Sequence, residues 1–457
     1  MHQFHPSILR KYDIRGVVGD TLTTDDVYAA GQCFGDLACE SGVSTVAVCR
    51  DGRLSSPEFE ESLVAGITST GINVVKVGMG PTPLLYYAVK GSDDIGGGVM
   101  ITGSHNDQTY NGLKMMLEAR PIWGADIKDF QRRIGTVSVK DSGHVSERDV
   151  SKDYLQRILQ DLALDPSLKV VWDCGNGAAG ELMQELVKSL PGEHTLLYAD
   201  VDGTFPNHHP DPTVEKNMGD LKKAVADKGA DIGIGFDGDG DRIGVISKSG
   251  QMIFGDQQMI LYGRDVLKNH PGATILVDVK TSKLVLDDLR THGGDPRLCA
   301  TGHSSIKAMM KETGALLAGE LSGHIFFADK YYGYDDALYA ALRLLNIISE
   351  GKDIDALLAD MPKSFKTPEM GIPCADERKF DVMARIQERV KSMDCGTVID
   401  MDGVRVETES GWWLLRASNT ESMLVARAEA DSEENLEVFL EELQFFLRKE
   451  GLEIPGQ

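Results

Sequence analysis

A short apolar segment that runs directly into a polar or glycine-rich loop recurs along this 457-residue chain. Residues 99–102 (VMIT) lead into GSHN, residues 169–174 (KVVWDC) into GNGAAG, and residues 231–236 (DIGIGF) into DGDGDR. Apolar runs of this length predict buried strands, and the amphipathic segments between them predict helices. Strands that alternate with helices favour parallel sheets. The chain is therefore predicted to contain successive α/β units whose polar loops lie at the ends of strands.

The first of these units can be followed in detail. Residues 44–49 (STVAVC) predict a strand, and residues 73–78 (NVVKVG) predict the next one. Between them, Ser56 is expected to be the N-cap of a helix that has Pro57 in its first turn. Gly71 is expected to end this helix. A strand, a helix and a second strand in this order predict a parallel βαβ unit.

The pattern begins again near residue 169 and near residue 274, and it changes in the last part of the chain. Residues 396–429 predict an antiparallel sheet with a hairpin turn at Asp402-Gly403, and residues 432–449 predict an amphipathic helix. Asp431 and Glu434 are expected to form the capping box of that helix. The predicted domains are residues 1–149, 150–251, 252–364 and 365–457.

Composition excludes several classes of protein. Lys and Arg number 47 against 71 Asp and Glu, a net charge of -24 that argues against non-specific nucleic-acid binding. The seven cysteines form no C-x-x-C pair, so neither a disulfide framework nor a zinc site is expected. No apolar run approaches ~20 residues, and the first residues have no apolar signal region. A cytoplasmic protein with no membrane or nucleic-acid partner is expected.

Three carboxylates alternate with glycines directly after the apolar strand at 231–236. Asp237, Asp239 and Asp241 supply hard oxygen ligands of the kind that suits Mg²⁺ or Ca²⁺. An EF-hand is excluded, because Arg242 and Lys248 stand where that loop needs Gly and Glu. A phosphatase that uses an aspartate nucleophile is not excluded by these residues alone.

Ser104 follows the strand at 99–102 in the sequence TGSHN. Thr102 and Asn106 stand where a hydrolase nucleophile elbow needs glycine, so that motif is excluded. An ordinary Ser/Asn turn remains open. A serine that carries a phosphoryl group needs a metal and cations to hold the charge of about −1.5 to −2. The candidate cations are Arg15 and Lys114.

Two further loops carry groups that suit a sugar phosphate. Glu320 and Ser322 lie two residues apart and can bind neighbouring sugar hydroxyls. A second loop combines a guanidinium, two hydroxyls and an amide, which can hold a phosphate; its residues are Arg416, Ser418, Asn419 and Thr420. Each loop alone is also consistent with an ordinary polar turn.

Taken in order, these loops resemble those of the α-D-phosphohexomutases, and specifically the bacterial phosphomannomutase/phosphoglucomutase branch. The resemblance also includes RKYDIRG at 10–16, RDGRLSSP at 50–57, VDGTFPNHHPDP at 201–212 and the segment 301–324. It implies three similar α/β domains with mixed sheets and a C-terminal α+β domain around a central cleft.

The resemblance also implies a role for each matching residue. Ser104 would be the phosphorylated serine and would complete a Mg²⁺ site with Asp237, Asp239 and Asp241. Lys114 and His303 would be the acid–base groups, with Arg15 and Arg242 beside them. The implied substrate-binding residues are Tyr12, Lys280, Glu320, Ser322, His324, Arg416, Ser418, Asn419 and Thr420.

The implied reaction interconverts the 1-phosphates and 6-phosphates of mannose and glucose through a hexose 1,6-bisphosphate, which would also act as activator. The fourth domain is expected to move while this intermediate turns over, and the protein is expected to be a monomer, or else a dimer. Three alternatives remain: a phosphoglucosamine mutase, a Mg²⁺-dependent sugar phosphatase with Asp237 as nucleophile, and a sugar-phosphate sensor without catalysis.

One residue departs from the family pattern. The family usually continues the serine loop as S-H-N-P, whereas this chain has Asp107 in place of the proline. The change frees the backbone and adds a carboxylate near the proposed phosphoserine. Because Ser104, His105 and Asn106 are present, only a quantitative effect on phosphoryl transfer is expected.

Overall fold

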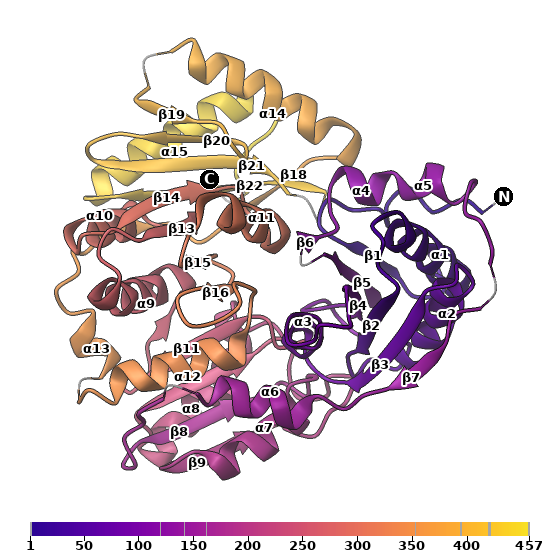
Figure 1. Cartoon of the computed structure of the whole chain (residues 1–457). Helices are drawn as coiled ribbons and strands as arrows, with labels where there is room; N and C mark the ends of the chain where they lie inside the picture. Colours follow the sequence, from indigo (N-terminus) through magenta and orange to yellow (C-terminus); the bar gives the residue numbers. More distant parts are fainter. Residues whose placement is uncertain are drawn as a thin grey trace.

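The computed structural model describes residues 2–118, 120–140, 142–160, 162–351, 353–393, 395–418 and 422–455. Within these ranges the strands form four sheets, which follow one another along the chain and surround a common centre (Figure 1). Three sheets combine parallel strands with antiparallel edge strands, and the fourth is antiparallel. The predicted fold class is therefore confirmed.

The first sheet has the order β1-β5-β4-β2-β3-β7, with β6 beside β5. β2 is parallel to β3 and β4, whereas β5 is antiparallel to β4 and β1. Its strands are β1 (Ile14–Val17), β2 (Thr45–Arg50), β3 (Asn73–Met79), β4 (Gly97–Ile101), β5 (Tyr110–Leu117), β6 (Arg120–Pro121) and β7 (Val145–Glu147). Its helices are α1 (Thr24–Glu40), α2 (Ser56–Thr68), α3 (Thr82–Lys90), α4 (Ala125–Lys128) and α5 (Phe130–Arg133).

The start of α2 differs by one residue from the prediction. The N-cap is Ser55, and Ser56 is already the first helical residue. The Ser56 hydroxyl instead donates a hydrogen bond of 2.6 Å to Asp51. The carboxylate of Asp51, in the loop between β2 and α2, therefore binds the side chain that was predicted to cap the helix. The helix ends at Thr68, and Gly71 (φ 86°) turns the chain into β3.

The second and third domains repeat the α/β arrangement. Their sheets have the orders β12-β11-β10-β8-β9 and β14-β13-β15-β16. The second domain contains α6 (Ser151–Ile158), β8 (Lys169–Asp173), α7 (Gly180–Leu186), η1 (Val187–Ser189), β9 (Glu193–Leu197), η2 (Glu215–Met218), α8 (Gly219–Lys228), β10 (Ile232–Phe236), β11 (Ile243–Ser247) and β12 (Met252–Ile253). The third contains α9 (Gly255–Asn269), β13 (Thr274–Asp278), α10 (Lys283–Thr291), β14 (Asp295–Cys299), α11 (His303–Thr313), β15 (Leu317–Gly319), β16 (Ile325–Phe327), α12 (Ala337–Ile348) and α13 (Ile354–Leu357).

The fourth domain is an antiparallel sheet of order β17-β22-β21-β20-β19, with β18 beside β22 and two long helices. Its elements are β17 (Phe365–Lys366), β18 (Met370–Pro373), α14 (Asp376–Lys391), β19 (Thr397–Ile399), β20 (Val404–Glu407), β21 (Gly411–Ala417), β22 (Met423–Ala430) and α15 (Glu433–Arg448). The predicted turn at Asp402-Gly403 joins β19 to β20. The predicted capping box of α15 is wrong: the N-cap is Ser432, whose hydroxyl accepts the backbone N–H of Asn435.

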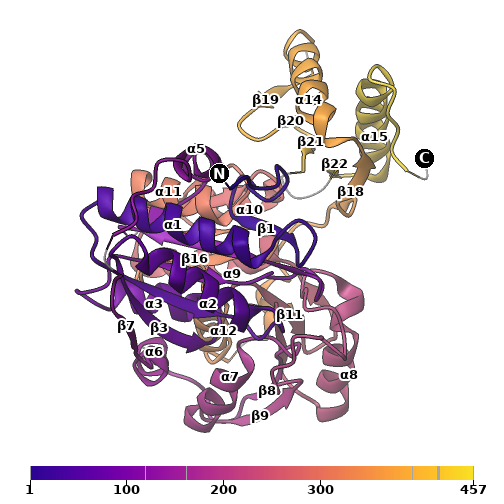
Figure 2. The same ribbon diagram turned by 90° about the vertical axis from the view of Figure 1, so that its right-hand side faces the viewer.

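The hydrophobic cores show how the domains are joined. One continuous core runs from Ala47 to Ile354 and includes residues of the first three domains. The fourth domain has its own core, around Trp413, and stands apart from the others in Figure 2. A small contact of Val279 with Trp412 and Leu414 joins it to the third domain. Among the described helices, none has the length and apolar character needed to cross a membrane.

Candidate active site

A cavity of about 1080 Å³ lies at the centre of the molecule and is lined by all four domains. The predicted site residues that line it are Tyr12, Arg15, Ser104, Lys114, Arg242, Lys280, His303, Glu320, Ser322, His324, Arg416 and Ser418. The three aspartates of the DGDGD loop are fully buried beside Ser104 and Lys114. Asn419 and Thr420 lie outside the described residues.

Ser104 lies on a tight loop after β4 and has a left-handed backbone conformation (φ 51°). Its hydroxyl donates a hydrogen bond of 3.2 Å to the Oδ2 atom of Asp237, on the loop after β10. The two loops touch closely, because a Cβ atom on Gly238 would lie 2.5 Å from the Ser104 carbonyl oxygen. Only glycine permits this approach of backbone to backbone. The serine and the carboxylate loop are thus brought together as expected.

The three carboxylates converge as a group. One ligand atom from each of Asp237, Asp239 and Asp241 lies within 4.8 Å of the others. The Oδ1 atoms of Asp239 and Asp241 are buried and have no hydrogen-bond partner among the described residues. Burial, with the charges of the other two carboxylates, raises the pKa of Asp237 well above its usual range. Unpartnered, buried carboxylate oxygens at this spacing are donors that fit a divalent cation.

Lys114, on β5, lies against these carboxylates. Its ammonium donates to Asp239 at 2.7 Å and also to Asp241. Burial would lower the pKa of Lys114, but the neighbouring carboxylates outweigh burial and raise it. The side chain is therefore held as a charged counterion of the carboxylate group at the edge of the cavity.

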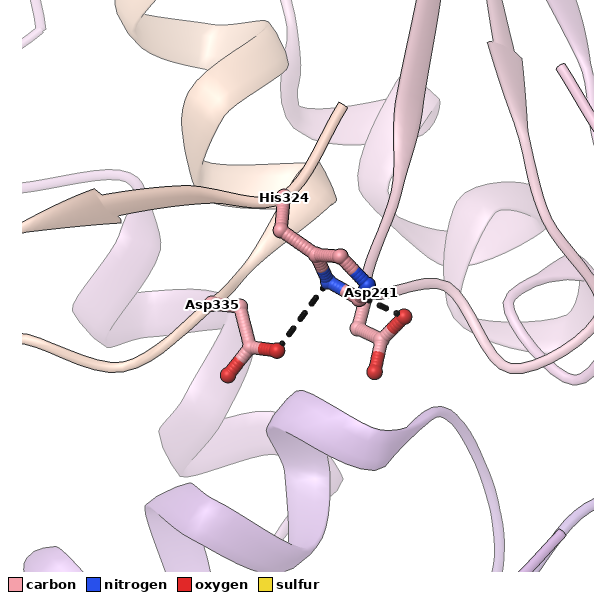
Figure 3. A group of neighbouring side chains, drawn as sticks. All are labelled: Asp241, His324 and Asp335. Carbon is pink, nitrogen blue, oxygen red and sulfur yellow. Dashed lines mark ion pairs between the residues drawn. The ribbon is translucent and has the colours of Figure 1, made fainter. Parts of the chain in front are cut away.

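A second cluster extends the carboxylate group into the third domain, as Figure 3 shows. The Nδ1 atom of His324 lies 3.1 Å from Asp335 and 3.5 Å from Asp241. Arg242 donates from Nε to the Nε2 atom of His324 at 3.0 Å, which assigns the ring proton to Nδ1. His324 is thereby oriented from both sides. The sequence did not point to Asp335. It directly precedes Asp336, the N-cap of α12, and an aspartate at the start of a helix needs no further explanation.

His303 is the first residue of α11, and its ring stacks on that of His324 with centroids 5.6 Å apart. Its Nδ1 atom lies 3.7 Å from Asp335 and 3.3 Å from the ammonium of Lys307. Burial and the Lys307 charge lower the pKa of His303 well below its usual range. These surroundings favour the uncharged form of the imidazole, which has one unprotonated nitrogen.

Glu320 and Ser322 lie at the opposite wall, after β15. The Ser322 hydroxyl donates to Glu320 Oε2 at 3.2 Å, while the buried Oε1 atom has no partner among the described residues. Lys280 lies 3.8 Å from Asp278 and 3.4 Å from Glu369. This wall therefore offers an unsatisfied acceptor beside a cation.

The fourth domain contributes Arg416, the last guanidinium of the predicted set. Its Nε atom donates to Asp402 at 3.0 Å, and its buried Nη2 atom has no partner in the described parts of the chain. Tyr12 donates its hydroxyl to the Thr301 carbonyl and thus links the first and third domains. Arg15 donates to Asn106 and Asp13, each at 2.5 Å.

Arg53 is a site residue that sequence reasoning did not single out, although it lies in the RDGRLSSP segment. Its buried guanidinium donates to the carbonyl oxygens of Ser104 at 2.9 Å, Asn106 at 2.6 Å, Tyr110 at 3.0 Å and Asp107. It therefore holds the backbone of the serine loop.

The carboxylate of Asp107 is bonded within its own loop. Its Oδ1 atom accepts the backbone N–H of Thr109 at 2.8 Å and the Thr109 hydroxyl at 2.5 Å. Burial would raise the pKa of Asp107, but these bonds lower it overall. An Asx turn thus takes the place of the family's proline in shaping the loop.

Comparison with known proteins bears on the whole chain. The sequence matches the family description "Phosphoglucomutase/phosphomannomutase, alpha/beta/alpha domain I" over residues 6–135, domain II over 152–250, domain III over 254–365 and the C-terminal domain over 369–444. A Pseudomonas aeruginosa protein named phosphomannomutase/phosphoglucomutase is 43% identical, covering 94% of this chain and 93% of that protein.

Two further matches agree. A phosphoglucomutase of Neisseria meningitidis is 44% identical, with 94% of each chain covered. A crystal structure of a phosphoglucomutase/phosphomannomutase family protein from Burkholderia thailandensis has a TM-score of 0.92, 40% identity and 99% coverage of each chain. The chain belongs to the phosphoglucomutase/phosphomannomutase family of enzymes.

Proposed function

We propose that this protein interconverts the 1-phosphates and 6-phosphates of mannose and glucose, with Ser104 as the phosphoryl carrier. The observation that carries the proposal is the position of the Ser104 hydroxyl. It lies at the wall of a cavity that all four domains line, 3.2 Å from a buried carboxylate of Asp237. Other walls offer a carboxylate oxygen on Glu320 and a guanidinium nitrogen on Arg416, neither of which has a hydrogen-bond partner among the residues that the structure describes.

The reaction consists of two phosphoryl transfers. In the first, the bond from phosphorus to Ser104 Oγ breaks and a bond forms to the free hydroxyl oxygen of a hexose monophosphate. The proton of that hydroxyl passes to a base, for which the neutral ring of His303 is suited. The base passes this proton to the released Ser104 Oγ. The resulting 1,6-bisphosphate turns end for end. The bond from its other phosphorus to the sugar oxygen then breaks, a bond forms to Ser104 Oγ, and the serine proton passes through the same base to the released sugar oxygen. Lys114 and Arg242 would stabilise the charge that develops in each transfer.

The carboxylates of Asp237, Asp239 and Asp241, with an oxygen of phosphorylated Ser104, would hold Mg²⁺. When bound, the ion would supply charge stabilisation for the transferred phosphoryl group. The Oδ1 atoms of Asp239 and Asp241, which have no hydrogen-bond partner within the described part of the chain, support this assignment.

The substrate would be held at two ends. Arg416 and Ser418, with Asn419 and Thr420, would bind the phosphate that is not being transferred. Glu320 and Ser322 would bind neighbouring sugar hydroxyls, and Tyr12, Arg15, Lys280 and His324 would complete the walls. Because the same groups must accept the sugar in both orientations, tolerance of mannose and glucose is expected. We further propose a cytoplasmic monomer with hexose 1,6-bisphosphate as activator and with domain boundaries near residues 150, 251 and 365.

The phosphoglucosamine mutase alternative is less well supported. A Methanosarcina barkeri protein named probable phosphoglucosamine mutase is 33% identical, against 43% for the Pseudomonas aeruginosa relative. The difference favours mannose and glucose phosphates as the substrates to test first.

The test is a coupled assay of purified protein with mannose, glucose and glucosamine 1-phosphates in parallel, with Mg²⁺ and a trace of glucose 1,6-bisphosphate. The expected products are the 6-phosphates of mannose and glucose. Ser104→Ala should abolish turnover, whereas Asp237→Asn should retain a little activity. Release of inorganic phosphate without any 6-phosphate would make the protein a phosphatase, and binding without turnover would make it a sensor.

A further inference from the structure

A second pocket of about 280 Å³ lies between the first and third domains, behind the wall of the central cavity. The residues that line it belong to α3, β5 and β6 of the first domain and to α11 and the loop after β16 of the third. Figure 1 shows where these elements lie. The volume approaches the lower end of the range for small-molecule sites, about 300 Å³. Lys114 and His303 line both cavities, so one face of each side chain belongs to the pocket.

The lining combines apolar surface with positive charge. Met115, Met116, Met310, Ala315 and Ala328 contribute apolar side chains. Met side chains adapt to irregular ligands, which suits such a wall. The pocket therefore has a place for the apolar body of a small molecule.

Four lysines line the same space: Lys90, Lys114, Lys307 and Lys311. Lys114 is already paired with Asp239 and Asp241. Lys307 is neutralised by Asp335 at 2.8 Å. By contrast, neither Lys90 nor Lys311 is within ion-pair distance of a carboxylate in the described parts of the chain. Burial lowers the pKa of Lys90, and repulsion from the ammonium groups of Lys311 and Lys307 lowers it further. An anion placed among them would relieve this repulsion.

We propose that this pocket binds a small organic anion with an apolar body, and that the bound ligand changes turnover through Lys114 and His303. The anionic group would lie between Lys90 and Lys311, and the apolar body would pack on the methionines. The ligand would contact the rear of two side chains whose front faces the central cavity. Its effect on the reaction rests on the proposed mutase function, whereas its binding does not.

The binding test uses 2-naphthalenesulfonate as the probe, titrated into the full chain and followed by its fluorescence. The uncharged 2-naphthalenesulfonamide is the matched ligand. We expect saturable binding of the sulfonate that persists with saturating glucose 1-phosphate, and at least tenfold weaker binding of the sulfonamide. Displacement of the sulfonate by glucose 1-phosphate in a competitive manner would place it in the central cavity and overturn the proposal.

The variant Lys90→Gln/Lys311→Gln should weaken sulfonate binding at least tenfold. The matched control, Lys223→Gln/Lys228→Gln, changes two exposed lysines on α8 and should leave binding unchanged. Ala328→Phe fills the pocket without removing charge and should also abolish binding. Equal binding by all these variants would contradict the site.

The regulatory part is tested by turnover of glucose 1-phosphate. Saturating 2-naphthalenesulfonate should lower kcat at least twofold with KM nearly unchanged, and the Lys90→Gln/Lys311→Gln variant should lose this effect. Tight binding without any change in kcat would overturn the coupling through Lys114 and His303. A protein with no mutase activity would still show the binding, so the two proposals fail separately.

Discussion

Several charged side chains around the serine loop are fully buried, and each is compensated by a specific partner. Arg53 is 1% exposed and pairs with Asp51 at 3.1 Å, while Lys114 pairs with Asp239 and Asp241. A buried charge that loses its partner costs far more than a surface ion pair contributes. Substitutions at these residues are therefore expected to affect both folding and activity.

Arg53→Met is expected to destabilise the protein by about 3–5 kcal/mol, because Asp51 is left as an unpaired buried charge. The serine loop also loses the guanidinium that binds its carbonyl oxygens. A displacement of Ser104 by about 1 Å would lower kcat roughly 100-fold. Thermal unfolding and steady-state kinetics measure the two effects. Arg120→Met, at an exposed pair with Asp126, is the control. Normal kcat in folded Arg53→Met would show that this guanidinium does not position Ser104.

Asp107→Pro is expected to change kcat by less than roughly tenfold, because the carboxylate already engages Thr109 and not Ser104. Steady-state turnover beside phosphoserine content measured by mass spectrometry provides the check. An increase in turnover of several orders of magnitude would show that Asp107 opposes phosphorylation directly.

His208 links pH to stability in the second domain. Its Nε2 atom lies 3.0 Å from Asp173, and although burial opposes the charge, that carboxylate raises the pKa of His208 above 6.5. A histidine whose pKa is raised by folding stabilises the folded protein at pH values below its pKa in the unfolded chain. This contribution is lost as the pH rises through its pKa in the folded protein. His208→Gln should therefore lower Tm more at pH 5.5 than at pH 8.5. An equal loss at both pH values would exclude a charged His208.

At the scale of elements, local rules decide where helices begin, but neighbouring residues compete for the same role. For α15 the competitors are Asp431 and Ser432. Ser432 caps the backbone of Asn435, and Asp431 binds the Asn435 side chain. Adjacent polar residues make the boundary of such a helix uncertain by one or two positions from sequence.

Ser432→Ala is expected to cost about 1 kcal/mol through the lost cap. Asp431→Ala should cost less, since only a side-chain bond at an exposed site is lost. Thermal unfolding of both variants, with Glu437→Ala on the exposed face of α15 as reference, gives the order. A larger loss of stability in Asp431→Ala than in Ser432→Ala would support the predicted capping box instead.

At the scale of the whole molecule, the hydrophobic cores indicate which domains are most closely joined. One core contains residues of the first three domains, and the first domain has a second core of its own. The core of the fourth domain is separate from both, and its apolar contact with the third domain consists of Val279, Trp412 and Leu414. Arg405 strengthens this junction by donating to the carbonyl oxygens of Val279 and Thr281, each at 2.7 Å. Because this junction joins two separate cores and its other contacts are polar, the fourth domain is expected to be able to rotate against the rest.

Glucose 1,6-bisphosphate is therefore expected to close the fourth domain over the cavity, since Arg416 would bind one of its phosphates. Small-angle scattering should show a smaller radius of gyration with the bisphosphate than with glucose, which lacks phosphate. Scattering profiles that are unchanged by the bisphosphate would count against this movement.

The sequence by itself determined the fold class and the family, and it predicted many of the side chains that line the central cavity. An apolar strand that ends in a polar loop is a local pattern, and Ser104, the DGDGD loop and Glu320 each lie in such a loop. They can therefore be predicted from the sequence. Tertiary structure alone decided which distant groups meet. Arg53 reaches four carbonyl oxygens more than 50 residues away, and Asp335 orients His324 from a position that looks like a helix cap. Such pairings depend on how sheets and loops approach in space, and no local pattern encodes that approach.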